Sequence, residues 1–244
     1  MQNSRAHTII LYGATGFTGK LVAEVFVRRG ARNWAMAGRN LEKLAAVRDE
    51  LKLPADFPLI QADASEPASL KAMCEATQMV VTTVGPYQKF GSELVEACAA
   101  AGTDYIDLNG EPVWMKRMIK AHAARAKESG ARILFSGGFD SIPSDLGVWF
   151  LQKQARETFG APLPRVRGRV RKIQGDASGG TMASMKATLK ATLRDPASLK
   201  ALNDPFALTP AITTSSFWVP FPTAAPSTPA CRATPIRATA RPAR

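Results

Sequence analysis

Short apolar runs alternate with longer stretches of helical periodicity through the first 145 residues of this 244-residue chain. Runs such as Met79-Val-Val-Thr-Thr-Val84 have the length of buried strands, while the stretches between them place apolar residues three and four positions apart. The pattern predicts strands at 8–12, 33–37, 58–61, 79–84, 104–107 and 131–136, and helices at 17–29, 40–52, 66–75, 89–101, 112–129 and 144–158. Such alternation is typical of parallel βαβ units with helices on both faces of a sheet. We therefore expect an α/β fold built on a doubly wound parallel sheet of six strands.

The first predicted strand leads directly into three glycines, Gly13, Gly16 and Gly19, and then into a predicted helix. In a dinucleotide-binding turn, one glycine permits the tight turn, one lets the backbone approach a pyrophosphate, and one lets the helix pack closely on the sheet. The free amides and the positive end of the helix dipole attract the phosphates. We therefore predict a Rossmann-type nucleotide site here, to which the intervening Thr15 and Phe17 also belong.

The end of the second predicted strand indicates which dinucleotide is bound. A carboxylate at this point would hold the ribose hydroxyls of NAD, but this chain has Gly38 followed by Arg39. The small residue leaves room for a 2′-phosphate, and the planar guanidinium can pair with it. Asp63, after the third predicted strand, is placed to accept from the adenine amino group. The predicted cofactor is therefore NADP, with Arg39 as a simple surface cation before the next helix as the alternative.

Residue spacing excludes two other nucleotide-dependent mechanisms. A Walker A loop requires a glycine before and a hydroxyl residue after its Gly-Lys pair, whereas Ala14 and Leu21 occupy these positions around Gly19-Lys20. The short-chain dehydrogenase pairing of tyrosine with a lysine four residues later is also missing, because the chain's three tyrosines are followed at that distance by Gly16, Gly91 and Asn109. Hydride transfer in this chain would need another arrangement of side chains.

The fourth predicted strand ends in Gly85, Pro86 and Tyr87, at the edge where open α/β sheets bind ligands. In such a fold this edge faces the ribose and nicotinamide, so Gly85 and Pro86 are predicted to contact the cofactor. Tyr87 is a candidate catalytic residue that would donate a proton or stack. Packing at the start of the next helix is the alternative for Tyr87.

Further polar residues follow the fifth and sixth predicted strands and reach the same edge. Asp140 and Ser141 are candidates for positioning the substrate or the nicotinamide amide, and Asn109-Gly-Glu111 adds polar groups nearby. Helix capping is the alternative for the segment after the sixth predicted strand, because Ser144 and the residue after it precede an apolar run as capping residues do. Capping is the favoured interpretation for Ser144.

The pattern changes after residue 160, which suggests a second, smaller α/β domain. Residues 165–173 alternate charged and mostly β-branched side chains like a half-exposed strand, and a helix is predicted from 179 to 193. From 211 to 244 the chain has no Asp or Glu and no sustained periodicity. We therefore predict a nucleotide-binding domain at 1–145, an incomplete second domain at 146–210, and a disordered tail at 211–244 that derives from an out-of-frame reading.

Composition narrows the partners and the location. The net charge of +12 arises from the C-terminal part. In residues 211–244 the basic residues are sparse and lack interleaved aromatics, so nucleic acid is not an expected partner. Three widely spaced cysteines and two histidines argue against a disulfide framework and against a metal site. The chain has no charged-then-apolar leader and no run of about 18 apolar residues, so we expect a cytoplasmic protein without a membrane span.

Several of these motifs together resemble the saccharopine dehydrogenase-like oxidoreductases, and within them the branch of trans-acting enoyl reductases. The resemblance covers about residues 8–210 and departs beyond Pro210. It is carried by five motifs: Tyr12-Gly-Ala-Thr-Gly-Phe-Thr-Gly19, Val84-Gly-Pro-Tyr87 with Gly91, Gly110-Glu111, Gly138-Phe-Asp-Ser-Ile-Pro-Ser-Asp145 and Ser178-Gly-Gly-Thr181.

The resemblance implies an NADP site in a Rossmann domain and a second domain that shapes the substrate pocket. It further implies reduction of an enoyl or imine-type bond in a small or lipid-linked substrate. A nucleotide-binding scaffold without turnover is the alternative function. The sequence does not decide between a monomer and a homo-oligomer.

Overall fold

The computed structural model describes residues 5–172, 174 and 179–194, together with 199, 202, 204, 207 and 208. All of these belong to one compact unit, Met1–Leu208. The predicted tail at 211–244 lies outside the described residues, and so do Ile173 and Ser178. The predicted limits between the domains stay predictions.

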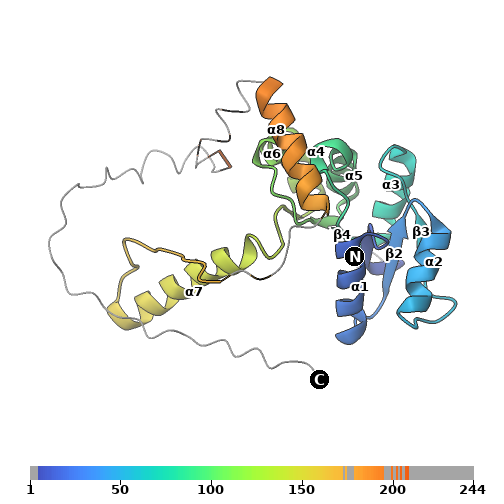
Figure 1. Ribbon diagram of the computed structural model, residues 1–244, viewed down its shortest axis with the longest axis horizontal. Helices are drawn as coiled ribbons and strands as arrows, with labels where there is room; N and C mark the ends of the chain where they lie inside the picture. Colours follow the sequence, from blue (N-terminus) through green and yellow to red (C-terminus); the bar gives the residue numbers. More distant parts are fainter. Residues whose placement is uncertain are drawn as a thin grey trace. The chain divides into compact units, whose positions relative to one another are not determined.

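The described residues contain a six-stranded parallel sheet in the order β3-β2-β1-β4-β5-β6. This order, in which the chain starts in the middle and reverses direction after the third strand, is that of a doubly wound Rossmann sheet. In Figure 1 the alternating strands and helices can be followed by their colour, from blue to green. The strands are β1 (His7–Tyr12), β2 (Trp34–Gly38), β3 (Leu59–Gln61), β4 (Thr77–Thr82), β5 (Asp104–Ile106) and β6 (Ile133–Leu134).

Eight helices are described, and the predicted fold class is confirmed by the six of them that lie between successive strands along the chain. They are α1 (Phe17–Arg28), α2 (Leu41–Glu50), α3 (Pro67–Glu75), α4 (Tyr87–Phe90), α5 (Ser92–Ala101), α6 (Pro112–Ser129), α7 (Ile142–Phe159) and α8 (Gly179–Arg194). Local chemistry sets several of their ends. Asn40 caps α2 by accepting from the backbone N–H of Lys43 at 2.8 Å, and α5 and α6 end at the left-handed glycines Gly102 and Gly130.

Two apolar layers lie on the two faces of the sheet. In β1, Ile10 and Tyr12 belong to one buried cluster and Leu11 to the other, as expected when successive side chains alternate between faces. The first layer packs against residues of α3, α5 and α6, including the fully buried Trp114, and the second against α1 and α2. Helices on both faces leave the carboxyl ends of the strands as the edge open to a ligand.

The structure corrects the sequence prediction at three places. The helix predicted at 89–101 is two helices, α4 and α5, that meet at Gly91, where an added Cβ would stand 2.8 Å from the Trp114 ring. The strand predicted at 165–173 is absent from residues 165–172. A strand forms only when a neighbouring strand satisfies its backbone, and alternation alone cannot supply that neighbour. Finally, α7 begins at Ile142, so Ser141 and not Ser144 occupies the N-cap position.

Candidate functional site

The three glycines form the turn that joins β1 to α1. Gly13 has φ +91°, and an added Cβ there would stand 2.7 Å from Cγ2 of Val84. A Cβ on Gly19 would stand 2.1 Å from the carbonyl oxygen of Gly13, so α1 starts directly against the turn. The N–H of Gly16 donates to the same carbonyl at 3.0 Å. The turn therefore has the close packing of helix on strand that a dinucleotide site requires.

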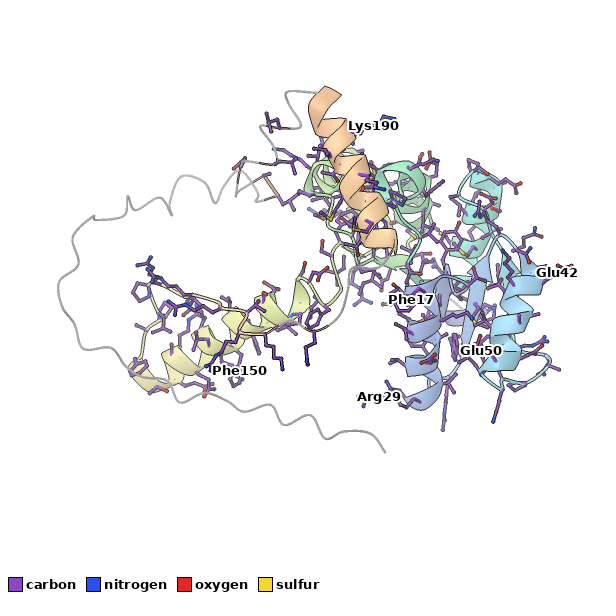
Figure 2. The ribbon with its side chains drawn as sticks, in the orientation of Figure 1. Phe17, Arg29, Glu42, Glu50, Phe150 and Lys190 are labelled. Carbon is purple, nitrogen blue, oxygen red and sulfur yellow. The ribbon has the colours of Figure 1, made fainter. Side chains whose placement is uncertain are left out.

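A cavity of about 220 Å³ opens over this turn at the carboxyl ends of β1, β2 and β4. Its lining includes six of the nine residues predicted to bind the cofactor: Gly13, Thr15, Gly16, Arg39, Asp63 and Gly85. Gly19 acts from beneath the turn instead. Phe17 and Pro86 are not on the lining, and Phe17 is 73% exposed at the first turn of α1 (Figure 2). We call this space the nucleotide cavity.

Three polar side chains give the nucleotide cavity its electrostatic character. Asp63 Oδ1 accepts from the N–H and the hydroxyl of Ser65 at 2.9 and 2.8 Å, and these bonds, with a smaller contribution from Arg39, lower the pKa of the Asp63 carboxyl. Arg39 is exposed on the cavity wall and is not the cap of α2. Burial, and secondly the charge of Asp63, raises the pKa of Tyr12 to about 12. A cation and an ionised carboxylate are thus available to a nucleotide.

A second cavity of about 510 Å³ adjoins the first, and the two share Thr83 and Gly85 on their linings. One wall comes from the ends of β4 and β5 and includes Asn109 and Gly110. The other wall comes from α8, with lining residues Gly180, Thr181, Ser184, Met185, Thr188 and Leu189. Among the described residues on its lining, Asp140 is the one charged side chain. We call this space the substrate cavity.

The three predicted catalytic residues are placed differently. Asp140 is exposed and lines the substrate cavity, whereas Ser141 is half-buried, occupies the N-cap position of α7 and is not on the lining. Tyr87 contributes to the same lining, but its hydroxyl donates to the Thr82 carbonyl at 3.3 Å and its ring packs 5.8 Å from that of Trp114. Burial, reinforced by Asp107, raises the pKa of Tyr87 well above its usual range. The geometry favours the packing interpretation of Tyr87.

A buried polar ladder of Asp107, Asn109 and Glu111 lies beside the substrate cavity. Sequence reasoning placed Asn109 and Glu111 at this edge but missed Asp107 and the hydrogen bonds that join the three. Asp107 Oδ1 accepts from the backbone N–H of Asn109 at 3.1 Å, and Asn109 Oδ1 accepts from the backbone N–H of Glu111 at 3.0 Å. Each side chain thus bonds the N–H two residues ahead, as Asn and Asp do in turns. Burial raises the pKa of Asp107, while hydrogen bonds from Tyr105, Asn109 and Ser136 oppose that rise. The signal was the placement of polar side chains at alternate positions in Asp107-Leu-Asn-Gly-Glu111.

Within the described ranges, no three His, Cys, Asp or Glu side chains gather closely enough to hold a metal ion. In the same part of the chain, no helix combines the length and the apolar character needed to cross a bilayer.

Comparison with known proteins identifies relatives over most of the chain. The family model described as the saccharopine dehydrogenase NADP binding domain matches residues 9–134. A Mycobacterium tuberculosis protein provisionally named as a trans-acting enoyl reductase is 48% identical over 208 residues, which is 84% of this chain and 50% of the relative. The trans-acting enoyl reductase of Mycobacterium ulcerans is 43% identical over the same fractions of the two chains. The chain thus spans about half the length of the curated relatives it matches.

Solved structures match the chain at lower similarity. Apo saccharopine dehydrogenase (L-Glu forming) from Saccharomyces cerevisiae is 16% identical, with a TM-score of 0.45, over 62% of this chain and 32% of that chain. The Citrobacter triphenylmethane reductase in complex with NADP(H) has a TM-score of 0.41 at 16% identity, over 63% and 55% of the two chains. Similarity at this level has no bearing on the substrate.

Proposed function

The chain belongs to the saccharopine dehydrogenase NADP binding domain family and its cofactor is NADP, and on this premise we propose that it reduces an enoyl or imine-type bond. The proposed substrate is a small or lipid-linked molecule. The observation that carries the proposal is the junction of the two cavities at Thr83 and Gly85. Because both spaces meet there, a nucleotide in one cavity reaches a substrate in the other.

The residues present fit the cofactor. The close approach of Gly19 to Gly13 leaves no room for a side chain between the turn and α1, so the N-terminus of α1 lies beside the turn, where it suits a pyrophosphate. Arg39 would pair with the 2′-phosphate, and Asp63 would accept from the adenine amino group. When bound, the cofactor supplies the hydride. The protein groups bind it, orient it and cover the site.

The lining of the substrate cavity favours particular substrates. Leu108, Met185 and Leu189 offer apolar surface to an acyl chain, while Asp140 adds one carboxylate and no described lining residue adds a cation. A free carboxylic acid would meet like charge from Asp140 without a compensating partner. A neutral enoyl thioester or ester meets no such penalty, and a protonated imine would be attracted. Asp140 is therefore the proposed substrate-positioning residue.

The test is NADPH oxidation by the full chain with three substrates: the N-acetylcysteamine thioester of crotonic acid, free crotonate and the cyclic imine 1-pyrroline. The proposal expects oxidation with the thioester or the imine and much less with free crotonate. Asp140→Asn should narrow the difference between thioester and free acid. The matched control is Ser141→Ala, because it alters a neighbouring side chain that is not on the lining. Oxidation with free crotonate alone would overturn the proposed substrate class.

A second function, nucleotide binding without turnover, is favoured by one observation. On α7 the apolar side chains of Leu146, Trp149 and Phe150 are 55%, 62% and 52% exposed, and Phe150 is labelled in Figure 2. Monomeric proteins seldom leave such side chains uncovered together. A chain whose substrate domain is left incomplete in this way would bind the nucleotide without completing turnover. Tight NADPH binding with no oxidation against any of the three substrates would support this scaffold function.

A further inference from the structure

We propose that Glu111 is a positioning residue that fixes the α8 wall of the substrate cavity against the nicotinamide end of the nucleotide cavity. The proposal rests on the proposed function, because it assigns the two cavities to cofactor and substrate. Glu111 itself is 2% exposed and touches neither ligand space directly. It would act through the backbone of α4 and a side chain of α8.

On the nucleotide side, the Glu111 carboxylate holds the start of α4. Its Oε1 accepts from the N–H of Tyr87 at 3.0 Å, and its Oε2 accepts from the N–H of Gln88 at 2.9 Å. These amides come immediately after Gly85 and Pro86, and Gly85 lies on the lining of both cavities. Two hydrogen bonds to a carboxylate thus fix the backbone that separates the two ligands.

On the substrate side, the same carboxylate holds α8. The hydroxyl of Ser184 donates to Glu111 Oε1 at 2.8 Å across 73 residues of sequence. Ser184 also approaches the nucleotide side, because a Cβ added to Gly85 would stand 3.9 Å from Ser184 Oγ. Thr181 and Thr188 lie three and four residues from Ser184 and share its cavity-lining face. The Glu111 carboxylate thus ties the cavity-lining face of α8 to the start of α4.

The Glu111 side chain binds α4 and α8 and does not cap its own helix. Glu111 occupies the N-cap position of α6, yet its side chain makes no cap bond there. Its backbone is held by the ladder instead, since its N–H donates to Asn109 Oδ1 at 3.0 Å. A carboxylate with a fixed backbone and three donors from two other elements links those elements.

The test follows hydrogen exchange of α8 in the full chain, with and without NADPH, and titrates NADPH in parallel. Ser184→Ala removes only the hydrogen bond between α8 and Glu111. Glu111→Gln disturbs that bond and also the two bonds to the start of α4. We expect Ser184→Ala to speed exchange in α8 about tenfold, as the loss of one hydrogen bond to a charged acceptor implies. Linkage requires the same variant to weaken NADPH only by the factor by which NADPH slows α8 exchange in the wild type. Glu111→Gln should speed α8 exchange equally and weaken NADPH further, and the double variant should match Glu111→Gln in α8.

A merely structural contact and a positioning contact differ in their response to NADPH. If Glu111 joins the two walls, NADPH slows α8 exchange in the wild type and not in Ser184→Ala. The matched control is Ser92→Ala, which removes a 3.0 Å hydrogen bond from Trp114 nearby without touching α8. Unchanged α8 exchange in Ser184→Ala, or NADPH-dependent protection that survives it, would overturn the proposal. Failure of NADPH to bind would instead contradict the proposed function, while exchange in the free protein still tests the link.

Discussion

Gly19 packs against Gly13 so closely that a Cβ atom on Gly19 would stand 2.1 Å from the Gly13 carbonyl oxygen. No side chain can be accommodated there without moving α1 away from the turn. The contact places the first turn of α1 beside the loop that is proposed to hold the pyrophosphate. It is the local reason why a strand, a turn and a helix together make a nucleotide site.

Gly19→Ala should therefore weaken NADPH binding and destabilise the fold. Overpacking of this kind costs about 1–3 kcal/mol, which corresponds to roughly a tenfold to hundredfold loss if it falls on the bound state. Fluorescence titration with NADPH and urea unfolding measure the two effects. Gly147→Ala in α7 is the matched control, because nothing lies within 4 Å of the added Cβ and a helical glycine gains from the change. Equal behaviour of the two variants would contradict the packing argument.

Arg39→Asp should weaken NADPH far more than NADH. The substitution removes the proposed partner of the 2′-phosphate and introduces a like charge, so we expect a loss of about ten- to a hundredfold for NADPH and a small change for NADH. Parallel titrations with the two cofactors measure the ratio. Arg117→Asp makes the same charge change on an exposed residue of α6 and should leave the ratio unaltered. Equal losses for both cofactors would show that Arg39 does not read the 2′-phosphate.

Tyr12 should make stability depend on pH in the alkaline range. Its side chain is 2% exposed, and burial raises its pKa from 10.0 to about 12. A raised pKa means that the folded state favours the neutral phenol, so the contribution is fully present below pH 10 and is lost as the pH rises from 10 towards 12. The loss should reach about 2–3 kcal/mol. Urea unfolding of wild type and Tyr12→Phe across this range isolates it, since the other buried tyrosines are common to both proteins. A constant difference between the two proteins would refute the assignment.

Tyr87→Phe should preserve NADPH binding and turnover and cost only stability. The Tyr87 hydroxyl donates to the Thr82 carbonyl inside the core, so its removal leaves one acceptor without this donor and costs about 0.5–1.5 kcal/mol. Urea unfolding and NADPH oxidation measure the two effects together. A loss of turnover by several orders of magnitude, with stability intact, would instead restore Tyr87 as the proton donor.

Much of the fold could be predicted because local periodicity carries it. The predicted strands at 8–12 and 104–107 and the helices at 17–29 and 112–129 differ from the structure by a residue or so. Six of the nine predicted cofactor residues meet at one cavity for the same reason: the carboxyl ends of parallel strands share an edge. The direction of the Tyr87 hydroxyl could not be predicted, because it depends on Trp114 and Thr82, which approach it only in the folded chain.

The sequence by itself determined the elements whose signal is local: apolar runs of strand length, amphipathic helices, and a glycine turn whose spacing allows only a close strand-to-helix junction. The tertiary structure decided everything that depends on partners distant along the chain. It left residues 165–172 without the strand that their alternation predicts, and it joined Glu111 to Ser184 across 73 residues. The physical reason is that backbone preference and hydrophobic period act over a few residues, whereas a strand partner or a buried hydrogen bond is chosen only when the whole chain packs.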